Sequence, residues 1–172
     1  MKMKIAALVL VVLLPVLAVT ATYASKPASG NGTVALVSSH RVGSSRIAGG
    51  NNITTVINTF VLTGPLTGRA VALERDVIHS SSERFLITFQ GVANFTKSTG
   101  GTATSTSMLV IRYVGINNGT FIHGQFVAGD GTGSLANFHG QGQFSGQVGP
   151  TPLNYTINWH INPADVKTKT AA

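Results

Sequence analysis

The sequence predicts an all-β domain, an antiparallel barrel or sandwich of about eight short strands. Segments rich in Val, Ile, Thr and Phe recur at short spacing between turns rich in Gly, Pro, Ser and Asn. After the N-terminal apolar segment no convincing helical pattern appears. Glycine occurs six times between residues 129 and 146. That density excludes a packed helix, because each interior glycine costs about 1 kcal/mol relative to alanine. A tight turn followed by a curved strand explains the run and favours a small barrel.

Residues 1–24 have the three parts of a secretory signal helix. A basic start precedes an apolar run at 5–19, and small residues precede a cleavage point at Ala24, with Ala21 as the alternative. The apolar run is shorter than the roughly 20 residues of a membrane-spanning helix, and Pro15 interrupts it. We therefore expect a secreted or cell-surface protein with no membrane attachment after signal cleavage; an uncleaved anchor is the lesser alternative.

The composition excludes several classes of site and partner. The chain has no cysteine, which rules out disulfides, thiolate catalysis and cysteine zinc sites. The formal net charge is +7, of which Lys2 and Lys4 in the signal contribute two, leaving +5. The remaining basic residues are scattered and do not alternate with aromatic residues, so no nucleic-acid partner is expected.

One domain accounts for the mature chain. We expect a polar linker at 25–32, the barrel at 33–162 and a flexible tail at 163–172. The predicted strands are, in order, 33–37, 53–62, 69–79, 84–95, 107–114, 120–128, 138–145 and 154–161. The first connection, 38–52, is rich in Ser, Gly and Arg and ends in a Gly-Gly-Asn-Asn turn. The next, TGPLTG at 63–68, has one proline and two glycines.

The middle strands are supported by composition and alternation. Strand 53–62 is rich in Ile, Val, Thr and Phe, and 69–79 follows the proline turn. The clearest strand, 84–95, alternates strictly, and one of its faces carries Phe85, Ile87, Phe89, Gly91, Ala93 and Phe95. A segment of Gly, Ser and Thr at 97–106 separates it from the apolar strand 107–114.

The last three strands follow from turns and from the same alternation. Turns at 116–119 and 129–133 precede strands 120–128 and 138–145. Strand 154–161 places its aromatic and aliphatic residues on one face and Asn, Thr and His on the other. Alternation predicts an inward-facing set made of Phe85, Ile87, Phe89, Phe95, Tyr155, Ile157 and Trp159.

Five N-x-T sequons occur, at Asn31, Asn52, Asn94, Asn118 and Asn154. Each is a candidate for glycosylation if the host modifies secreted proteins. The alternative is that these residues serve only as turn and strand residues in a Thr-rich chain. Asn94 and Asn154 lie on the polar faces of their predicted strands, as a glycan requires.

Carboxylates are scarce, and two of them share a strand face. Glu74 and Asp76 alternate with Arg75, so either the acids or the arginine enter the interior. A buried carboxylate has a raised pKa and is able to act as a general acid or base, which makes Glu74 the candidate catalytic residue. The alternative is a surface ion pair near a strand end.

Further candidates for binding a ligand lie in the apolar strands. Either Arg112 or Tyr113 must point inward, which makes Arg112 a candidate. The other candidate ligand-binding residues are Arg75, Phe89, Tyr155 and Trp159. The five histidines show no metal-ligand spacing, and the glycine run lacks the Lys-Ser/Thr pair of a phosphate loop. No metal and no cofactor are expected.

Four segments carry a resemblance to a known family: 63–68 (TGPLTG), 74–79 (ERDVIH), 90–95 (QGVANF) and 131–146 (GTGSLANFHGQGQFSG). Over about 33–161 the chain resembles an uncharacterised group within the allene oxide cyclase barrel-like superfamily. The resemblance implies an eight-stranded antiparallel barrel with a central cavity. Relatives include allene oxide cyclase, which closes a fatty-acid epoxide, and dirigent proteins, which orient phenoxy radicals. Their pocket residues do not match here one by one; only Glu74 is a loose counterpart of an interior glutamate.

The expected function is the non-catalytic binding of a small apolar ligand inside the barrel. Two alternatives remain open at this point. One is a cyclase or isomerase that acts on a small hydrophobic substrate through Glu74 or Arg75. The other is a cell-surface structural protein that assembles by strand exchange at a barrel seam. The oligomeric state is not predicted.

Overall fold

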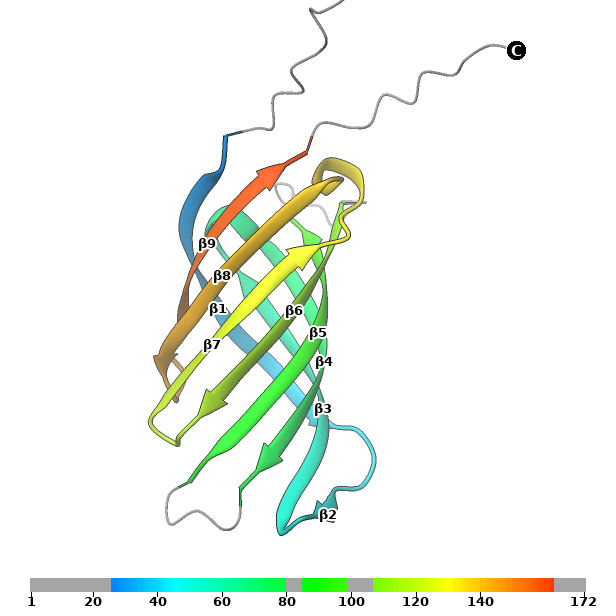
Figure 1. Cartoon of the computed structure of the whole chain (residues 1–172), viewed down its shortest axis with the longest axis vertical. Coiled ribbons are helices and arrows are strands. Elements are labelled where there is room, and N and C mark those ends of the chain that lie inside the picture. The colour runs from blue at the N-terminus through cyan, green and yellow to red at the C-terminus, as the bar shows by residue number, and fades with distance from the viewer. Residues whose placement is uncertain (1–25, 80–84, 99–106, 163–172) are drawn as a thin grey trace, which may run out of the picture.

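The computed structural model describes residues 26–79, 85–98 and 107–162, which form an antiparallel β-barrel (Figure 1). Its elements are β1 (Ala28–Arg41), β2 (Arg46–Ala48), β3 (Asn51–Leu62), η1 (Gly64–Leu66), β4 (Gly68–Ile78), β5 (Ile87–Lys97), β6 (Met108–Asn117), β7 (Phe121–Gly129), η2 (Gly133–Leu135), β8 (Phe138–Gln147) and β9 (Leu153–Ile161), where η marks a short 3-10 helix. The predicted signal at 1–24 and tail at 163–172 lie outside the described residues.

Strand β1 closes the barrel because it pairs with both ends of the strand series. Its first half, from Ala28 to Val34, pairs with β9, and its second half, from Val34 to Arg41, pairs with β3. From β3 to β9, neighbouring strands follow the order of the chain. Eight strands therefore form the closed barrel, and β2 adds a short ninth strand beside β3. The predicted eight-stranded antiparallel barrel is confirmed, and the sandwich alternative is excluded.

The closing strand β1 is much longer than the predicted strand at 33–37. Residues 28–32, expected to belong to a linker, pair with β9. Residues 38–41, expected to belong to a loop, continue along β3 after an irregularity between Leu36 and Ser38. The local sequence gave no sign of this, because Gly, Ser and Asn have low strand propensity and become strand only through long-range pairing.

The prediction that Phe85 faces the interior is wrong. Strand β5 begins at Ile87, whose partner Ile78 ends β4, so Phe85 lies beyond the last pair of this ladder. Its side chain is 54% exposed and lies beside the turn residue Gly119. Alternation predicts the facing of a side chain only within a paired strand.

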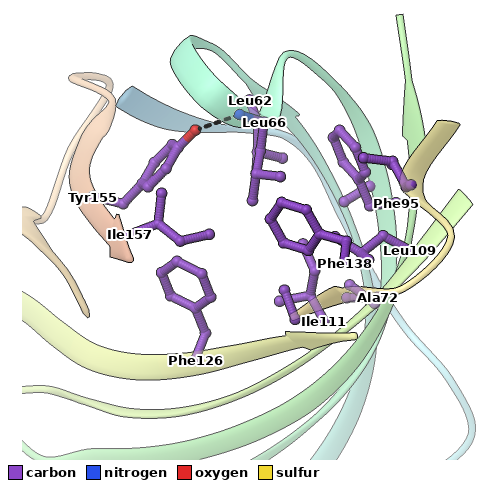
Figure 2. Close-up of a cluster of buried hydrophobic side chains, with 14 residues drawn as sticks. Leu62, Leu66, Ala72, Phe95, Leu109, Ile111, Phe126, Phe138, Tyr155 and Ile157 are labelled. Carbon is purple, nitrogen blue, oxygen red and sulfur yellow. Dashed lines mark hydrogen bonds between the residues drawn. The ribbon is translucent and has the colours of Figure 1, made fainter. Parts of the chain in front are cut away.

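Apolar side chains fill one end of the barrel, where η1, η2, the start of β1 and the end of β9 lie (Figure 1). Figure 2 shows this cluster, which we call the plug. Phe95, Leu109 and Ile157 are at most 1% exposed in it. Each short helix adds one buried leucine, Leu66 from η1 and Leu135 from η2. The plug therefore combines strand residues with the connections that cross this end.

Inward glycines make room for aromatic rings across the barrel wall. Five glycines lie directly opposite an aromatic residue of the neighbouring strand whose ring takes up the space of a Cβ: Gly32 opposite Tyr155, Gly91 opposite Tyr113, Gly115 opposite Phe89, Gly124 opposite Phe144, and Gly142 opposite Phe126. At each of these glycines an added Cβ would overlap the opposite ring. An eight-stranded barrel is only just wide enough for its interior side chains, so a ring on one strand requires a residue without a side chain on the next.

Tyr155 on β9 fastens η1, which follows β3, to a strand beyond β1. Its hydroxyl donates a hydrogen bond to the carbonyl oxygen of Thr63 at 2.6 Å and accepts one from the backbone N–H of Leu66 at 3.1 Å (Figure 2). The backbone N–H of Leu66 is buried at the plug, so water cannot easily take the place of the Tyr155 hydroxyl there.

We expect Tyr155→Phe to destabilise the protein by about 1–3 kcal/mol, because it leaves a buried backbone N–H without its partner. The ring itself stays, so packing against Phe126 should be kept. The midpoint of urea unfolding measures the effect, and the slope of the transition should not change. An unchanged midpoint would show that the hydroxyl contributes nothing to the attachment of η1.

Candidate functional site

Beyond the plug, the barrel interior contains a cavity of about 400 Å³. At one end it is lined by plug residues such as Leu62 and Leu66. At the other end it is lined by the β8–β9 connection, where Val148 and Thr151 are exposed. The β8–β9 connection lies at the end of the barrel opposite η1 and η2 (Figure 1). Its exposed lining residues indicate that the cavity opens to solvent there. Its volume is within the range of small-molecule sites.

Four aromatic rings that line the cavity contact one another and form what we call the aromatic band: Phe60, Phe89, Tyr113 and Phe144. Neighbouring rings of this band lie 6.2 to 6.4 Å apart between centroids. Two of these contacts, Phe60 with Tyr113 and Tyr113 with Phe144, are edge-to-face. Such pairs hold one another in place, so the wall of the cavity is preorganised.

Strand β4 directs its two acidic side chains into the cavity and Arg75 outward. Glu74 and Asp76 line the cavity, whereas Arg75 is exposed on the outer surface. Glu74 Oε1 accepts a hydrogen bond from Asn58 Nδ2 at 2.9 Å, and its Oε2 accepts one from the Tyr113 hydroxyl at 2.6 Å. Of the two arrangements left open by the sequence, the structure therefore shows the one with interior carboxylates.

Gly91 allows Tyr113 to reach Glu74. In the register, Glu74 on β4 is opposite Gly91 on β5, and Gly91 is opposite Tyr113 on β6. A Cβ at position 91 would overlap the Tyr113 ring and its hydroxyl oxygen. The tyrosine therefore leans across an empty position of β5, and its hydroxyl meets a carboxylate two strands away.

Glu74, Asp76, Asn58 and Tyr113 make up what we call the interior polar group, and burial sets its protonation. Desolvation raises the pKa of Glu74 from 4.5 to about 7; hydrogen bonds from Tyr113 and Asn58 oppose this rise, and the charge of Asp76 adds to it. Burial also raises the pKa of Asp76, and a hydrogen bond with Glu74 opposes that rise. Burial and the charge of Glu74 raise the pKa of Tyr113, so its hydroxyl stays protonated and donates. Near neutral pH the Glu74 carboxyl is therefore able both to give and to take a proton.

Several buried acceptors in the barrel have no hydrogen-bond partner. They are Asn52 Oδ1, Asn58 Oδ1 and Asp76 Oδ1. Asn58 is 5% exposed and, like Asp76, lines the cavity. A buried polar atom without a partner is costly, so this pattern points to an interior that is completed by another molecule or by water.

The candidate residues from the sequence are distributed over different surfaces. Phe89 and Tyr155 line the cavity. Trp159 faces inward but stacks on Phe138 at 6.5 Å, against the plug. Arg112 points outward and forms a surface ion pair with Asp130 at 3.0 Å, so Tyr113 is the inward residue of that pair of neighbours. Arg75 and Arg112 therefore lie on the outer surface and do not contact Glu74 and the other polar residues of the cavity.

The sequence did not identify Asn58 as an interior residue, and it did not indicate that Tyr113 binds Glu74. Once Glu74 is placed inside, alternation along β6 marks Tyr113 as inward because Leu109 and Ile111 are inward. Asn58 carries no such signal, since an asparagine in a Thr-rich strand usually faces solvent.

The asparagines of the sequons occupy different environments. Asn31, Asn94, Asn118 and Asn154 are exposed, and Asn52 is half-buried with its side-chain oxygen covered. Asn118 also has a structural role, because its Oδ1 accepts hydrogen bonds from the backbone N–H groups of Thr120 and Phe121. All five remain candidates for modification.

Comparison with family models and with curated proteins finds no match to this chain. Within residues 26–79, 85–98 and 107–162, no cluster of three or more His, Cys, Asp and Glu side chains is placed to hold a metal ion. In the same described part of the chain, no helix has the length and apolar character needed to cross a membrane. The site is therefore interpreted from its own geometry.

Proposed function

We propose that this chain is a secreted or cell-surface barrel that binds a small, largely apolar molecule in its interior without transforming it. The observation that carries the proposal is the open cavity of about 400 Å³ walled by the aromatic band. Binding sites of this kind are mostly apolar with a few convergent polar groups, as here with Glu74, Asp76 and Asn58. The secretory signal predicted from the sequence at 1–24 supports secretion, and the closed eight-stranded topology is compatible with an allene oxide cyclase-like barrel.

The test is a titration with N-phenyl-1-naphthylamine, an uncharged apolar dye that brightens when it leaves water. The wild-type protein should bind the dye with saturation at one equivalent. Val56→Phe adds a ring to a residue that lines the cavity and should weaken dye binding by about tenfold or more. The matched control is Val92→Phe on the outer face of β5, where the side chain is 48% exposed.

The control should bind the dye as the wild type does. Absence of a saturable signal in the wild type would contradict the proposal. Equal weakening by Val56→Phe and Val92→Phe would place the dye elsewhere. Thermal unfolding of both variants shows whether a loss of binding is a loss of fold.

The Glu74 carboxyl favours one second candidate, an isomerase or cyclase acting on a small hydrophobic substrate. A carboxyl with a pKa of about 7 in a cavity is suited to general acid or base catalysis. The two functions are distinguished by incubating a small molecule that the barrel binds with the purified protein for a long time and then analysing the molecule. A binding protein leaves the molecule unchanged. An isomerase produces a compound of equal mass but different retention time, and Glu74→Gln should abolish that product while the outward variant Arg75→Ala keeps it.

A further inference from the structure

The interior polar group has more hydrogen-bond acceptors than donors. Its donors are Asn58 Nδ2 and the Tyr113 hydroxyl, and both already donate to Glu74. Asn58 Oδ1 and Asp76 Oδ1 are buried without a donor. Carboxylates offer only acceptors when ionised, so a molecule that brings further donors would complete the group.

The same group also lacks a positive charge. Among the residues that the structure describes, only Asp76 acts on Glu74 through its charge, and it is of the same sign. The neighbouring arginines of β4 and β6, Arg75 and Arg112, are exposed on the outside of the barrel. Two carboxylates in a partly desolvated cavity are therefore without a counter-charge from the protein.

The aromatic band lies in the same cavity as the carboxylates. Tyr113 belongs to both, because its ring packs on Phe60 and Phe144 while its hydroxyl binds Glu74. The faces of aromatic rings attract cations, and the rest of the band offers an apolar surface. One molecule that reaches Glu74 must therefore pass or contact these rings.

We propose that the ligand is a small hydrophobic amine whose protonated nitrogen binds between Glu74 and Asp76 while its apolar part lies against the aromatic band. This inference rests on the proposed function, that the cavity binds a small molecule. An ammonium group brings three donors and one positive charge, which are the two things that the interior lacks. An alcohol brings one donor and no charge, and a carboxylate would add a third negative charge. Ca²⁺ takes six to eight oxygen ligands and gains nothing from the rings.

The experiment measures displacement of N-phenyl-1-naphthylamine at pH 7 by octylamine, 1-octanol, sodium octanoate and calcium chloride. The three organic probes share one tail and differ only in the head group. Octylamine should displace the dye at a concentration at least about tenfold lower than octanol, and octanoate should be the weakest. The ratio of the octanol to the octylamine dissociation constant is taken within each variant, so changes in dye affinity cancel.

Two variants locate the preference for the amine. Glu74→Gln and Asp76→Asn should each bring the ratio close to one, and the second keeps the proposal testable if the first fails to fold. Asp130→Asn removes a surface carboxylate, paired with Arg112, and should keep the wild-type ratio.

Three results would overturn the inference. Equal displacement by octylamine and octanol in the wild type would remove the amine while leaving a binding function in place. Displacement by calcium chloride but not octylamine would assign a metal site instead. If the dye does not bind at all, the proposed function fails as tested with the dye. Calorimetric titration with octylamine then tests the inference directly, and no binding of octylamine would overturn it.

Discussion

Gly124→Ala should destabilise the barrel by about 3 kcal/mol or more, because the added methyl group would overlap both a ring and the backbone of a neighbouring strand. Gly124 lies on β7 directly opposite Phe144. A Cβ there would overlap the Phe144 ring and the carbonyl oxygen of Val114, and would lie 2.9 Å from the Cα of Gly115. Because backbone is involved on one side, the overlap cannot be relieved by a rotamer change alone.

The matched control is Gly129→Ala at the end of the same strand. An added Cβ at position 129 would have its nearest neighbours at 3.9 Å, an ordinary contact. The free energy of unfolding of this variant should lie within about 0.5 kcal/mol of the wild-type value. Urea unfolding followed by circular dichroism compares the two. Equal stability of both variants would show that the ring does not lie across Gly124, and Gly124→Ala combined with Phe144→Leu should recover part of the loss.

The glycine run of β8 shows how much of this design the sequence carries. Alternation places Phe138, Gly140, Gly142 and Phe144 on one face, and glycine within a strand indicates close approach of another group. The structure confirms that reading, since Phe126 of β7 lies across Gly142. Which ring meets which glycine depends on register, and register follows from closing the barrel rather than from any local pattern.

The facing of β4 could not be predicted, because its polarity runs against the usual rule. Its outward residues Val71 and Leu73 are 46% and 56% exposed, whereas Ala72 and Glu74 face inward. The interior beside β4 is already occupied by large residues such as Phe95, so small residues fit there. A prediction that places the more hydrophobic face of a strand inside would therefore have put Val71 and Leu73 in the interior and the carboxylates on the surface.

Glu74, the candidate catalytic residue from the sequence, should make the stability of the barrel depend strongly on pH. Burial raises the pKa of Glu74 to about 7, above the 4.5 of an unfolded chain. Between these values the folded state holds a proton that the unfolded state has released. The contribution of Glu74 to the free energy of unfolding therefore falls as pH rises from 4.5 to about 7, and this contribution is fully present only below pH 4.5.

Glu74→Gln removes this dependence, because glutamine is a neutral mimic of the protonated acid. At pH 4 the variant and the wild type should have similar free energies of unfolding, since both side chains are then uncharged. At pH 8 the variant should be the more stable by about 3 kcal/mol, the value of a pKa shift from 4.5 to about 7. Asp76, whose pKa burial also raises, remains in both proteins, and its pKa depends on Glu74, so the difference between the two curves reports the coupled pair of carboxyl groups.

Urea unfolding at intervals from pH 4 to pH 8 gives both curves. Parallel curves would show that the Glu74 carboxylate is as well solvated in the barrel as in the unfolded chain. A wild type that gains stability over the variant as pH rises would show that Tyr113 and Asn58 bind the charged form more strongly than burial disfavours it. Saturating octylamine should reduce the difference between the curves at pH 8, because an ammonium beside Glu74 supplies the charge whose absence makes the carboxylate costly.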